Sequence, residues 1–220
     1  MATTDRQKQM QEAEELLGDR LQRLGFAQGL FFGRLLSDRL LAYPQQGSGT
    51  PGSAMAARLR EFCRLAIDPV AIDRQERIPD DVIRGLGELG VLGACLPADC
   101  GGRGLSQTDY CRVIEVLGGH CASTALFVNA HHSIGPRAIV LFGTPRQQQA
   151  YLPKLATGEW ISAFALTEPE AGSDAANVQT TATPTADGSG YVLQGEKRWI
   201  TNGGIAKVLT VMARTPVPGS

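Results

Sequence analysis

The spacing of hydrophobic residues before Gly158 is that of a series of amphipathic helices separated by helix-breaking residues. The predicted helices span residues 56–65, 82–89, 106–117, 122–142 and 144–153. Ser106 and Thr144 are good amino-terminal caps, and a break near 133–136 divides the fourth helix into a buried pair. Pro153 is expected to restrict the end of the last helix. The pattern therefore predicts an all-helical structure up to Gly158.

The residues before the main body form a leader with a weaker pattern. Two short amphipathic helices are predicted over 7–17 and 30–41, and the 25–29 region loosens the chain between them. Residues 43–53 (YPQQGSGTPGS) concentrate Pro, Gly and Ser and are predicted to be a linker. A domain boundary is therefore expected there.

After Trp160 the sequence changes to short segments rich in Thr, Val and aromatic residues, which is the pattern of β-strands. The candidate strands span 161–166, 178–183, 191–194, 197–201 and 209–214. The DGSG run at 187–190 is a strong hairpin signal. No closing strand precedes the TPVPGS at 215–220, so the β part is expected to be cut rather than finished. Helices followed by strands predict the α+β class.

Composition narrows the possible functions. A chain of 220 residues with 43% hydrophobic residues can bury one or two ordinary domains, and its net charge of −1 argues against nucleic acid as a partner. The five cysteines contain no C-x-x-C pair, which favours reduced thiols and a cytoplasmic location. The amino terminus does not suit a secretory signal or a transit peptide, no run reaches membrane-spanning length, and membrane contact is not indicated.

Two motifs lie in the stretch 158–204, around which the rest of the chain is organised. They are FALTEPEAGSD at 164–174 and KRWITNGG at 197–204. In this order and spacing they resemble the T-E-P-x-A-G-S-D and W-I-[TS]-N-G signatures of the acyl-CoA dehydrogenases, flavoenzymes of fatty-acid or related acyl-CoA oxidation. The chain thus resembles the amino-terminal part of such an enzyme.

Further matches extend the resemblance over roughly Ala56 to Pro216. Residues 96–105 resemble the family's P-x-x-x-G-G-x-G-L turn, and residues 131–158 resemble its helical approach to the β domain. Residues 26–44 and the phrase at 211–216 are similar to the very-long-chain branch of the family.

The resemblance implies three parts: a helical leader and linker (1–53), an α-helical domain (54–158), and the first strands of a β-barrel-like middle domain (159–220). The family's carboxy-terminal helical domain is then absent from this chain. The implied cofactor is FAD, and Ser173 is also implied to bind the acyl-CoA substrate. The residues implied to bind FAD are Phe164, Ala165, Leu166, Thr167, Glu168, Pro169, Glu170, Ala171, Gly172, Ser173, Trp199, Ile200 and Thr201.

The resemblance also assigns roles within this set. A flavin that accepts a hydride at N5 needs polar partners at its pyrimidine edge and a dry apolar face. Thr167 is implied to reach that edge, Trp199 to pack by the ring system, and Thr201 to hydrogen-bond near N5. The small turn at 171–173 would let backbone amides approach phosphate oxygens.

The implied reaction is the α,β-dehydrogenation of an acyl-CoA thioester to the trans-2-enoyl-CoA, with electrons passed to an electron-transferring flavoprotein. The family's catalytic glutamate lies beyond Ser220, while Glu168 and Glu170 belong to the flavin loop. The chain is therefore expected to contain no catalytic residue, to be inactive alone, and to bind FAD weakly or not at all. A homo-oligomer, dimer or tetramer, is expected for the complete protein.

Other interpretations of these residues stay open. Thr167 and Thr201 would also suit ordinary strands, and residues 168–174 would suit a polar surface loop. Ser173 lacks the G-x-S-x-G context of a hydrolase nucleophile. The apolar residues of 30–36 would suit a lipid contact, although packing on the protein itself is the more common outcome.

Two further interpretations concern metal and function. The candidate metal ligands are His120, Cys121, His131 and His132. Their spacing fits no closed ligand set, so they are interpreted as helix-end residues and as part of a helix beside the β domain, and no metal is expected. The functional alternatives are a short non-catalytic module that binds a partner, and a related flavin oxidase such as an acyl-CoA oxidase or a nitroalkane oxidase.

Overall fold

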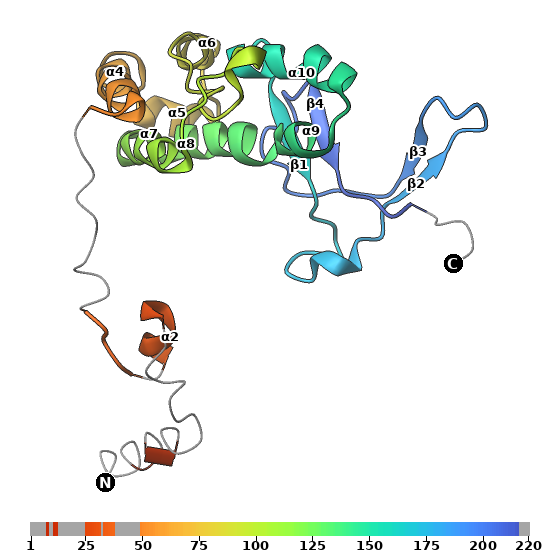
Figure 1. Cartoon of the computed structure of the whole chain (residues 1–220), viewed down its shortest axis with the longest axis horizontal. Coiled ribbons are helices and arrows are strands. Elements are labelled where there is room, and N and C mark those ends of the chain that lie inside the picture. Colours follow the sequence, from red (N-terminus) through yellow and green to blue (C-terminus); the bar gives the residue numbers. More distant parts are fainter. Residues whose placement is uncertain (1–7, 9–10, 13–24, 32, 38–48, 216–220) are drawn as a thin grey trace. The chain divides into compact units, whose positions relative to one another are not determined.

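The structure is a computed structural model that describes residues 8, 11–12, 25–31, 33–37 and 49–215 (Figure 1). The chain divides into two compact units, residues 1–47 and 48–220. In the described residues no helix is both long enough and apolar enough to cross a membrane.

The first unit contains the short helix α2 (Phe26–Phe31). The prediction of a loosened chain over 25–29 is wrong, because this helix runs through Gly29. The helix predicted over 30–41 holds for Leu30 and Phe31, which end α2, and is wrong for residues 33–37, which contain no helix. Gly33, with φ 69°, accounts for the stop after α2, because a helix cannot continue through a left-handed residue. Most of the predicted helix over 7–17 lies outside the described residues.

The second unit begins with a helical body, as predicted (Figure 1). Its elements are α4 (Pro51–Ala66), α5 (Pro69–Gln75), α6 (Asp80–Glu88), η2 (Ala98–Cys100), α7 (Gln107–His120), α8 (Ala122–Asn129), η3 (Ala130–Ile134), α9 (Arg137–Phe142) and α10 (Pro145–Thr157). Ser106 and Thr144 cap α7 and α10 as predicted, and the capping box of Thr144 is completed by Gln147.

Helix α4 begins inside the predicted linker, so the linker is wrong for its last three residues. Thr50 caps the helix by accepting the Ser53 amide N–H, and Pro51 has the backbone angle that a first helical turn needs. A side chain at Gly52 would lie 2.3 Å from Cβ of Asp109, so glycine permits α4 to approach α7 closely. Pro51, Gly52 and Ser53 of the predicted linker are therefore the start of a packed helix.

Three other helix predictions need correction. No helix is predicted between 65 and 82, yet α5 forms there because Asp68 caps it and Pro69 supplies its first residue. Pro153 lies inside α10, which continues to Thr157 and ends at the left-handed Gly158. The second member of the pair predicted as buried, α9, is largely exposed, with Phe142 84% exposed.

The core of this unit lies where α4, α6, α7 and α8 pack together. Its largest fully buried hydrophobic side chains are Leu59, Leu86, Leu92, Leu117, Leu152, Leu155, Val82, Val91, Val113 and Val128. The buried side chains recur every three or four residues, at Met55, Leu59 and Cys63 on α4 and at Tyr110, Val113 and Leu117 on α7, which is the predicted helical periodicity.

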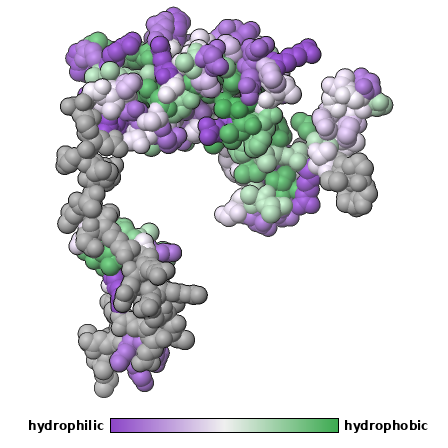
Figure 2. All heavy atoms as spheres, viewed as in Figure 1, coloured by the Kyte–Doolittle hydropathy of each residue, from purple (hydrophilic) through white to green (hydrophobic). Residues whose placement is uncertain are grey.

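Four short strands follow the helical body, which confirms the predicted α+β order. They are β1 (Ser162–Ala165), β2 (Thr181–Pro184), β3 (Tyr191–Gln194) and β4 (Val208–Val211), with the turn η4 (Ala175–Asn177) before β2. Strands β1 and β4 pair in parallel, whereas β2 and β3 form the predicted antiparallel hairpin. Figure 2 shows hydrophobic residues reaching the surface near the β1–β4 pair, where Leu209 is 46% exposed.

The strand predicted over 197–201 is wrong. Trp199 and Asn202 have φ of 58° and 66°, which a β-strand cannot contain, and residues 201–205 form turns. This segment is instead an irregular loop that leads into β4.

Core packing on α4 gives the first prediction. Leu59→Ala removes a fully buried side chain and should lower the free energy of unfolding by about 2 to 5 kcal/mol, because it leaves a cavity. Leu65→Ala is the matched control on the same helix, since Leu65 is 68% exposed, and should cost less than about 1 kcal/mol. Urea unfolding followed by circular dichroism measures both. Equal effects would contradict the assigned core.

Candidate functional site

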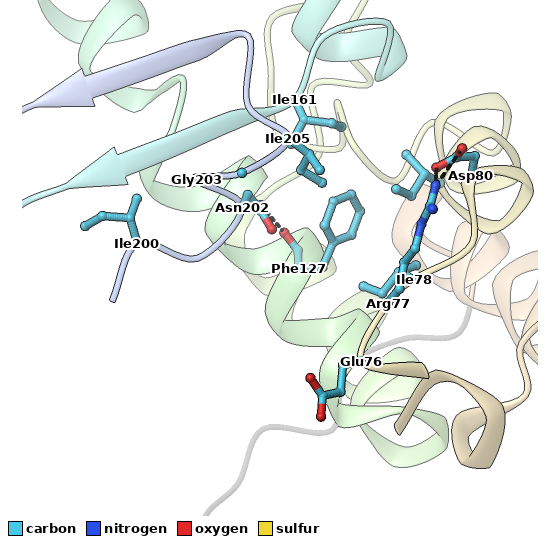
Figure 3. Close-up of a pocket in the computed structure, with 12 residues that line it drawn as sticks. Glu76, Arg77, Ile78, Asp80, Phe127, Ile161, Ile200, Asn202, Gly203 and Ile205 are labelled. Carbon is cyan, nitrogen blue, oxygen red and sulfur yellow. Dashed lines mark hydrogen bonds and ion pairs between the residues drawn. The ribbon is translucent and has the colours of Figure 1, made fainter. Parts of the chain in front are cut away.

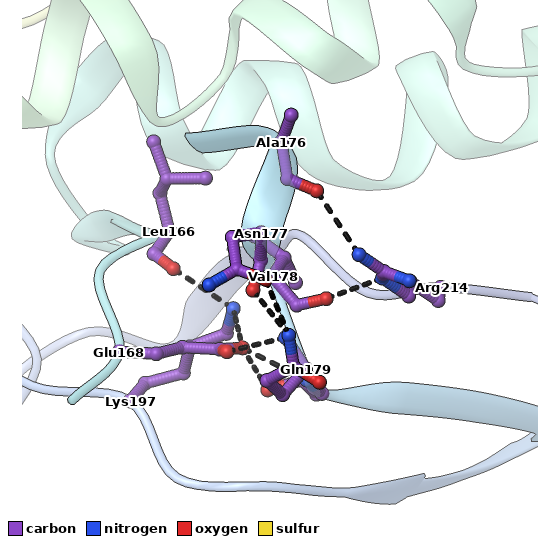
Figure 4. A network of polar contacts seen from close by, with 9 residues as sticks. Leu166, Glu168, Ala176, Asn177, Val178, Gln179, Lys197 and Arg214 are labelled. Carbon is purple, nitrogen blue, oxygen red and sulfur yellow. Dashed lines mark hydrogen bonds and ion pairs between the residues drawn. The ribbon is translucent and has the colours of Figure 1, made fainter. Parts of the chain in front are cut away.

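Lys197 holds the two motifs together (Figure 4). Its Nζ donates to the Leu166 carbonyl at 2.9 Å and to the Glu168 carboxylate at 2.7 Å. The neighbouring Arg198 amide N–H donates to the Thr167 carbonyl at 2.9 Å. Three successive residues of the first motif are thus bound to the start of the second.

The Glu168 carboxylate is the buried centre of this network. The residue is 5% exposed, and it accepts the backbone N–H groups of Gln179 and Thr180 together with the Thr180 hydroxyl. Burial alone would raise the pKa of the Glu168 carboxyl, but hydrogen bonds from Lys197, Thr180 and two backbone amides outweigh burial and lower it to about 2. Glu168 is therefore a fixed anion that anchors the chain before β2.

Arg214 fixes the other side of the same segment. Its guanidinium donates to the Val178 carbonyl at 2.5 Å and to the Ala176 carbonyl at 3.1 Å, as Figure 4 shows. The loop between the first motif and β2 is consequently held from both ends.

Several polar groups of the two motifs face outward without a protein partner. In the described part of the chain, the hydroxyls of Thr167 and Thr201 and the indole N–H of Trp199 make no hydrogen bond, and neither do the amides of Gly172 and Ser173. The Trp199 side chain is 87% exposed. A side chain at Gly172 would meet nothing within 4 Å, so the space over this turn is open. Open space beside unpaired donors fits a ligand that carries phosphate and ring acceptors.

By exposure, the predicted residues other than Trp199 and Thr201 fall into three groups. Ala165, Glu168 and Ala171 are buried in the chain itself, so their side chains support the loop. Residues on the outer surface of the loop are Pro169, Glu170, Gly172 and Ser173, while Phe164, Leu166, Thr167 and Ile200 are half-buried.

A cavity of about 780 Å³ adjoins the second motif (Figure 3). It lies between the segment from Glu76 to Ile83, Phe127 of α8, Ile161 and the loop 200–205. Asn202 lies at its wall and donates to the Phe127 carbonyl at 3.0 Å, so the loop is fixed to the helical body. Of the predicted residues, Ile200 lines this cavity and Thr201 lines a neighbouring one of about 320 Å³.

Lys197 and Asn202 belong to the second motif, but the resemblance assigns them no role. Asn202 carries a local signal, because an asparagine before two glycines is a common place for a left-handed residue. Lys197, between Glu196 and Arg198, carries no local signal of its buried partners. His131 and His132 lie in η3 beside β1, and no group of three or more His, Cys, Asp or Glu residues that could hold a metal occurs among the described residues.

Comparison with known proteins shows which family has this arrangement of domains and motifs. Residues 52–159 match the acyl-CoA dehydrogenase N-terminal domain, and residues 163–219 match the acyl-CoA dehydrogenase middle domain. The chain is 42% identical over 195 residues to the human very long-chain specific acyl-CoA dehydrogenase, mitochondrial, covering 87% of this chain and 30% of that protein. It is 40% identical over 207 residues to a probable acyl-CoA dehydrogenase, FadE10, of Mycobacterium tuberculosis. That match covers 93% of this chain and 32% of FadE10.

A solved structure gives the same result. The crystal structure of an acyl-CoA dehydrogenase complexed with FAD from Bacillus anthracis matches with a TM-score of 0.70 and 37% identity, over 79% of this chain and 30% of that one. A helical domain followed by short strands, with these two motifs in and between the strands, matches the N-terminal domain and the start of the middle domain of this class of protein. This chain belongs to the acyl-CoA dehydrogenase family. It spans about a third of the length of the curated relatives it matches.

The role of Lys197 gives the second prediction. Lys197→Met leaves the Glu168 carboxylate buried without its cation and should lower the melting temperature by about 5 °C, because a buried charge that loses its partner is strongly destabilising. Arg198→Met breaks an exposed ion pair with Glu196 and should change the melting temperature little. Differential scanning fluorimetry measures both. Similar shifts in the two variants would remove Lys197 from its structural role.

The low pKa of Glu168 gives the third prediction. The folded pKa is about 2 and the ordinary value is 4.5, so between these values the unfolded chain takes up a proton that the folded chain does not. This contribution to stability is fully present above about pH 4.5 and is lost as the pH falls toward 2. The Glu168→Gln variant lacks this carboxylate and its contribution to stability. Its urea midpoint should therefore fall less steeply than that of the wild type between about pH 6 and pH 3. Glu196→Gln, at an exposed carboxylate, should keep the wild-type slope.

Proposed function

We propose that this chain forms one wall of the FAD site of an acyl-CoA dehydrogenase of the fatty-acid oxidation type. The observation that carries the proposal is the joining of both motifs by Lys197, which binds Leu166 and Glu168 of the first motif from the start of the second. The similar Bacillus anthracis enzyme is complexed with FAD, which supports the choice of ligand.

The residues of the two motifs suit parts of this cofactor. The exposed indole of Trp199 offers an apolar surface against which a planar ring can pack. The hydroxyls of Thr167 and Thr201 offer hydrogen bonds to ring nitrogens and oxygens, and the amides of Gly172 and Ser173 suit phosphate oxygens. Bound FAD supplies the acceptor for a hydride equivalent taken from the substrate.

The same network argues against a catalytic base within the first motif. Glu168 has a pKa of about 2, and its oxygens accept hydrogen bonds from Lys197 and the start of β2, so it is a poor proton acceptor. The proposed reaction, α,β-dehydrogenation of an acyl-CoA to the trans-2-enoyl-CoA, therefore takes its α-proton with a carboxylate other than Glu168, and the family resemblance suggests one outside these motifs. Ser173, exposed on the loop, is proposed to contact the substrate.

The proposal extends to the partners of the whole protein. An electron-transferring flavoprotein is proposed as the electron acceptor, and a homo-oligomer is proposed as the assembly in which the flavin site is complete. Both rest on membership of the family.

The fourth prediction tests the flavin site directly. The purified chain should bind FAD weakly, with a Kd of about 100 μM, because part of the binding energy is spent on ordering an open site. Thr201→Val should weaken binding about fivefold to tenfold by removing one hydrogen bond. Titration followed by flavin fluorescence measures the affinity.

A matched control is Thr183→Val, which removes an exposed strand hydroxyl from β2, away from both motifs, and should leave the affinity unchanged. Equal losses in both variants would remove Thr201 from the proposed site. A wild-type chain that shows no binding at about 1 mM FAD would contradict the proposal that these residues hold the cofactor.

A further inference from the structure

A single buried histidine connects the helical body to the strand that leads into the first motif. His131 lies in η3 and is completely buried. Its Nε2 lies 3.0 Å from the Leu155 carbonyl at the end of α10, and its Nδ1 accepts the Ser162 amide N–H at 3.0 Å. The Ser162 hydroxyl donates to the His131 carbonyl at 2.9 Å. Three separate segments therefore meet on one side chain.

These contacts determine the protonation of the ring. An amide N–H can only donate, so Nδ1 carries no proton, and Nε2 carries the proton that it donates to the Leu155 carbonyl. Burial lowers the pKa of His131 to about 4, which keeps the ring neutral near pH 7. A neutral imidazole with one donor and one acceptor is the form that this position needs.

The backbone of η3 is shaped for this contact. This element is a π-helix, a rare conformation that is often found at functional positions. It ends at Gly135, where a side chain would lie 2.0 Å from the Ser162 hydroxyl oxygen. The Gly135 carbonyl in turn accepts the Thr210 hydroxyl of β4 at 2.9 Å. The end of η3 thus contacts both strands of the parallel pair.

Strand β1 begins at Ser162 and continues directly into the first motif at Phe164. We propose that His131 is a positioning residue, which sets the place of β1 against the helical body and thereby holds the first motif in its working position. The inference rests on the proposed flavin role of that motif for its functional meaning.

Amide hydrogen exchange without flavin tests the coupling independently of cofactor binding. His131→Phe keeps a planar buried ring but removes both hydrogen bonds, so exchange in residues 162–173 should become about tenfold faster. Exchange in residues 55–65 of α4 should keep its wild-type rate. Failure of the chain to bind FAD would contradict the proposed function and leave this result unaffected.

The neighbouring histidine is the matched control. His132 is also buried in η3, but its Nε2 accepts the Cys95 amide N–H inside the helical body. His132→Phe should therefore leave exchange in residues 162–173 unchanged relative to the helical body. A selective increase of the same size in His132→Phe, or an equal increase everywhere in His131→Phe, would overturn the proposal.

A second variant covers the case in which His131→Phe does not fold. Gly135→Ala keeps the imidazole and the helical backbone, since φ at this position is −60°, but its methyl group meets Ser162. It should separate η3 from β1 and give the same selective increase in residues 162–173. Wild-type exchange in this segment would show that the contact does not position the motif.

Discussion

The pairing of the half-buried Lys197 ammonium with the buried Glu168 carboxylate imposes the arrangement on which the candidate site depends. A buried carboxylate needs donors around it, and the Lys197 ammonium, which also donates to the Leu166 carbonyl, supplies one of them. Glu168 is satisfied in turn by the start of β2. Two segments separated by a hairpin are thus joined because neither charge can be left alone. The loop conformation of the second motif, with its left-handed Trp199, is compatible with this joining where a regular strand would not be.

The parts of the fold that the sequence predicts correctly are those set by residues close together in the chain. Helix caps act within a few residues, so Ser106 and Thr144 identified the starts of α7 and α10, and the DGSG run identified the β2–β3 hairpin. Proline was the main source of error, because its fixed φ suits the first helical turn as well as a stop. Pro51 and Pro69 start helices, although the local sequence predicts a linker at Pro51 and no helix at Pro69.

The sequence predicts which residues belong to the candidate site, but not how those residues are arranged in space. The two motifs identified the segments that the structure brings together, but the pairing depends on contacts between positions about 30 apart, such as Leu166 with Lys197. The parallel pairing of β1 with β4 is equally non-local, since parallel strands need a long connection between them. Nothing in the neighbourhood of Asn202 shows that it will bind Phe127, 75 residues away along the chain.

The contrast between satisfied and unsatisfied groups distinguishes support from function in this region. Ala165, Glu168 and Ala171 are buried, and the polar atoms of Glu168 are fully used by the chain. Thr167, Trp199 and Thr201 belong to the same two segments, and within the described residues their side-chain polar groups have no protein partner. Exposed groups of this kind bond to water in the free chain, so leaving them without a protein partner costs little. Under the proposed function, these are the groups of the two segments that remain available to a ligand.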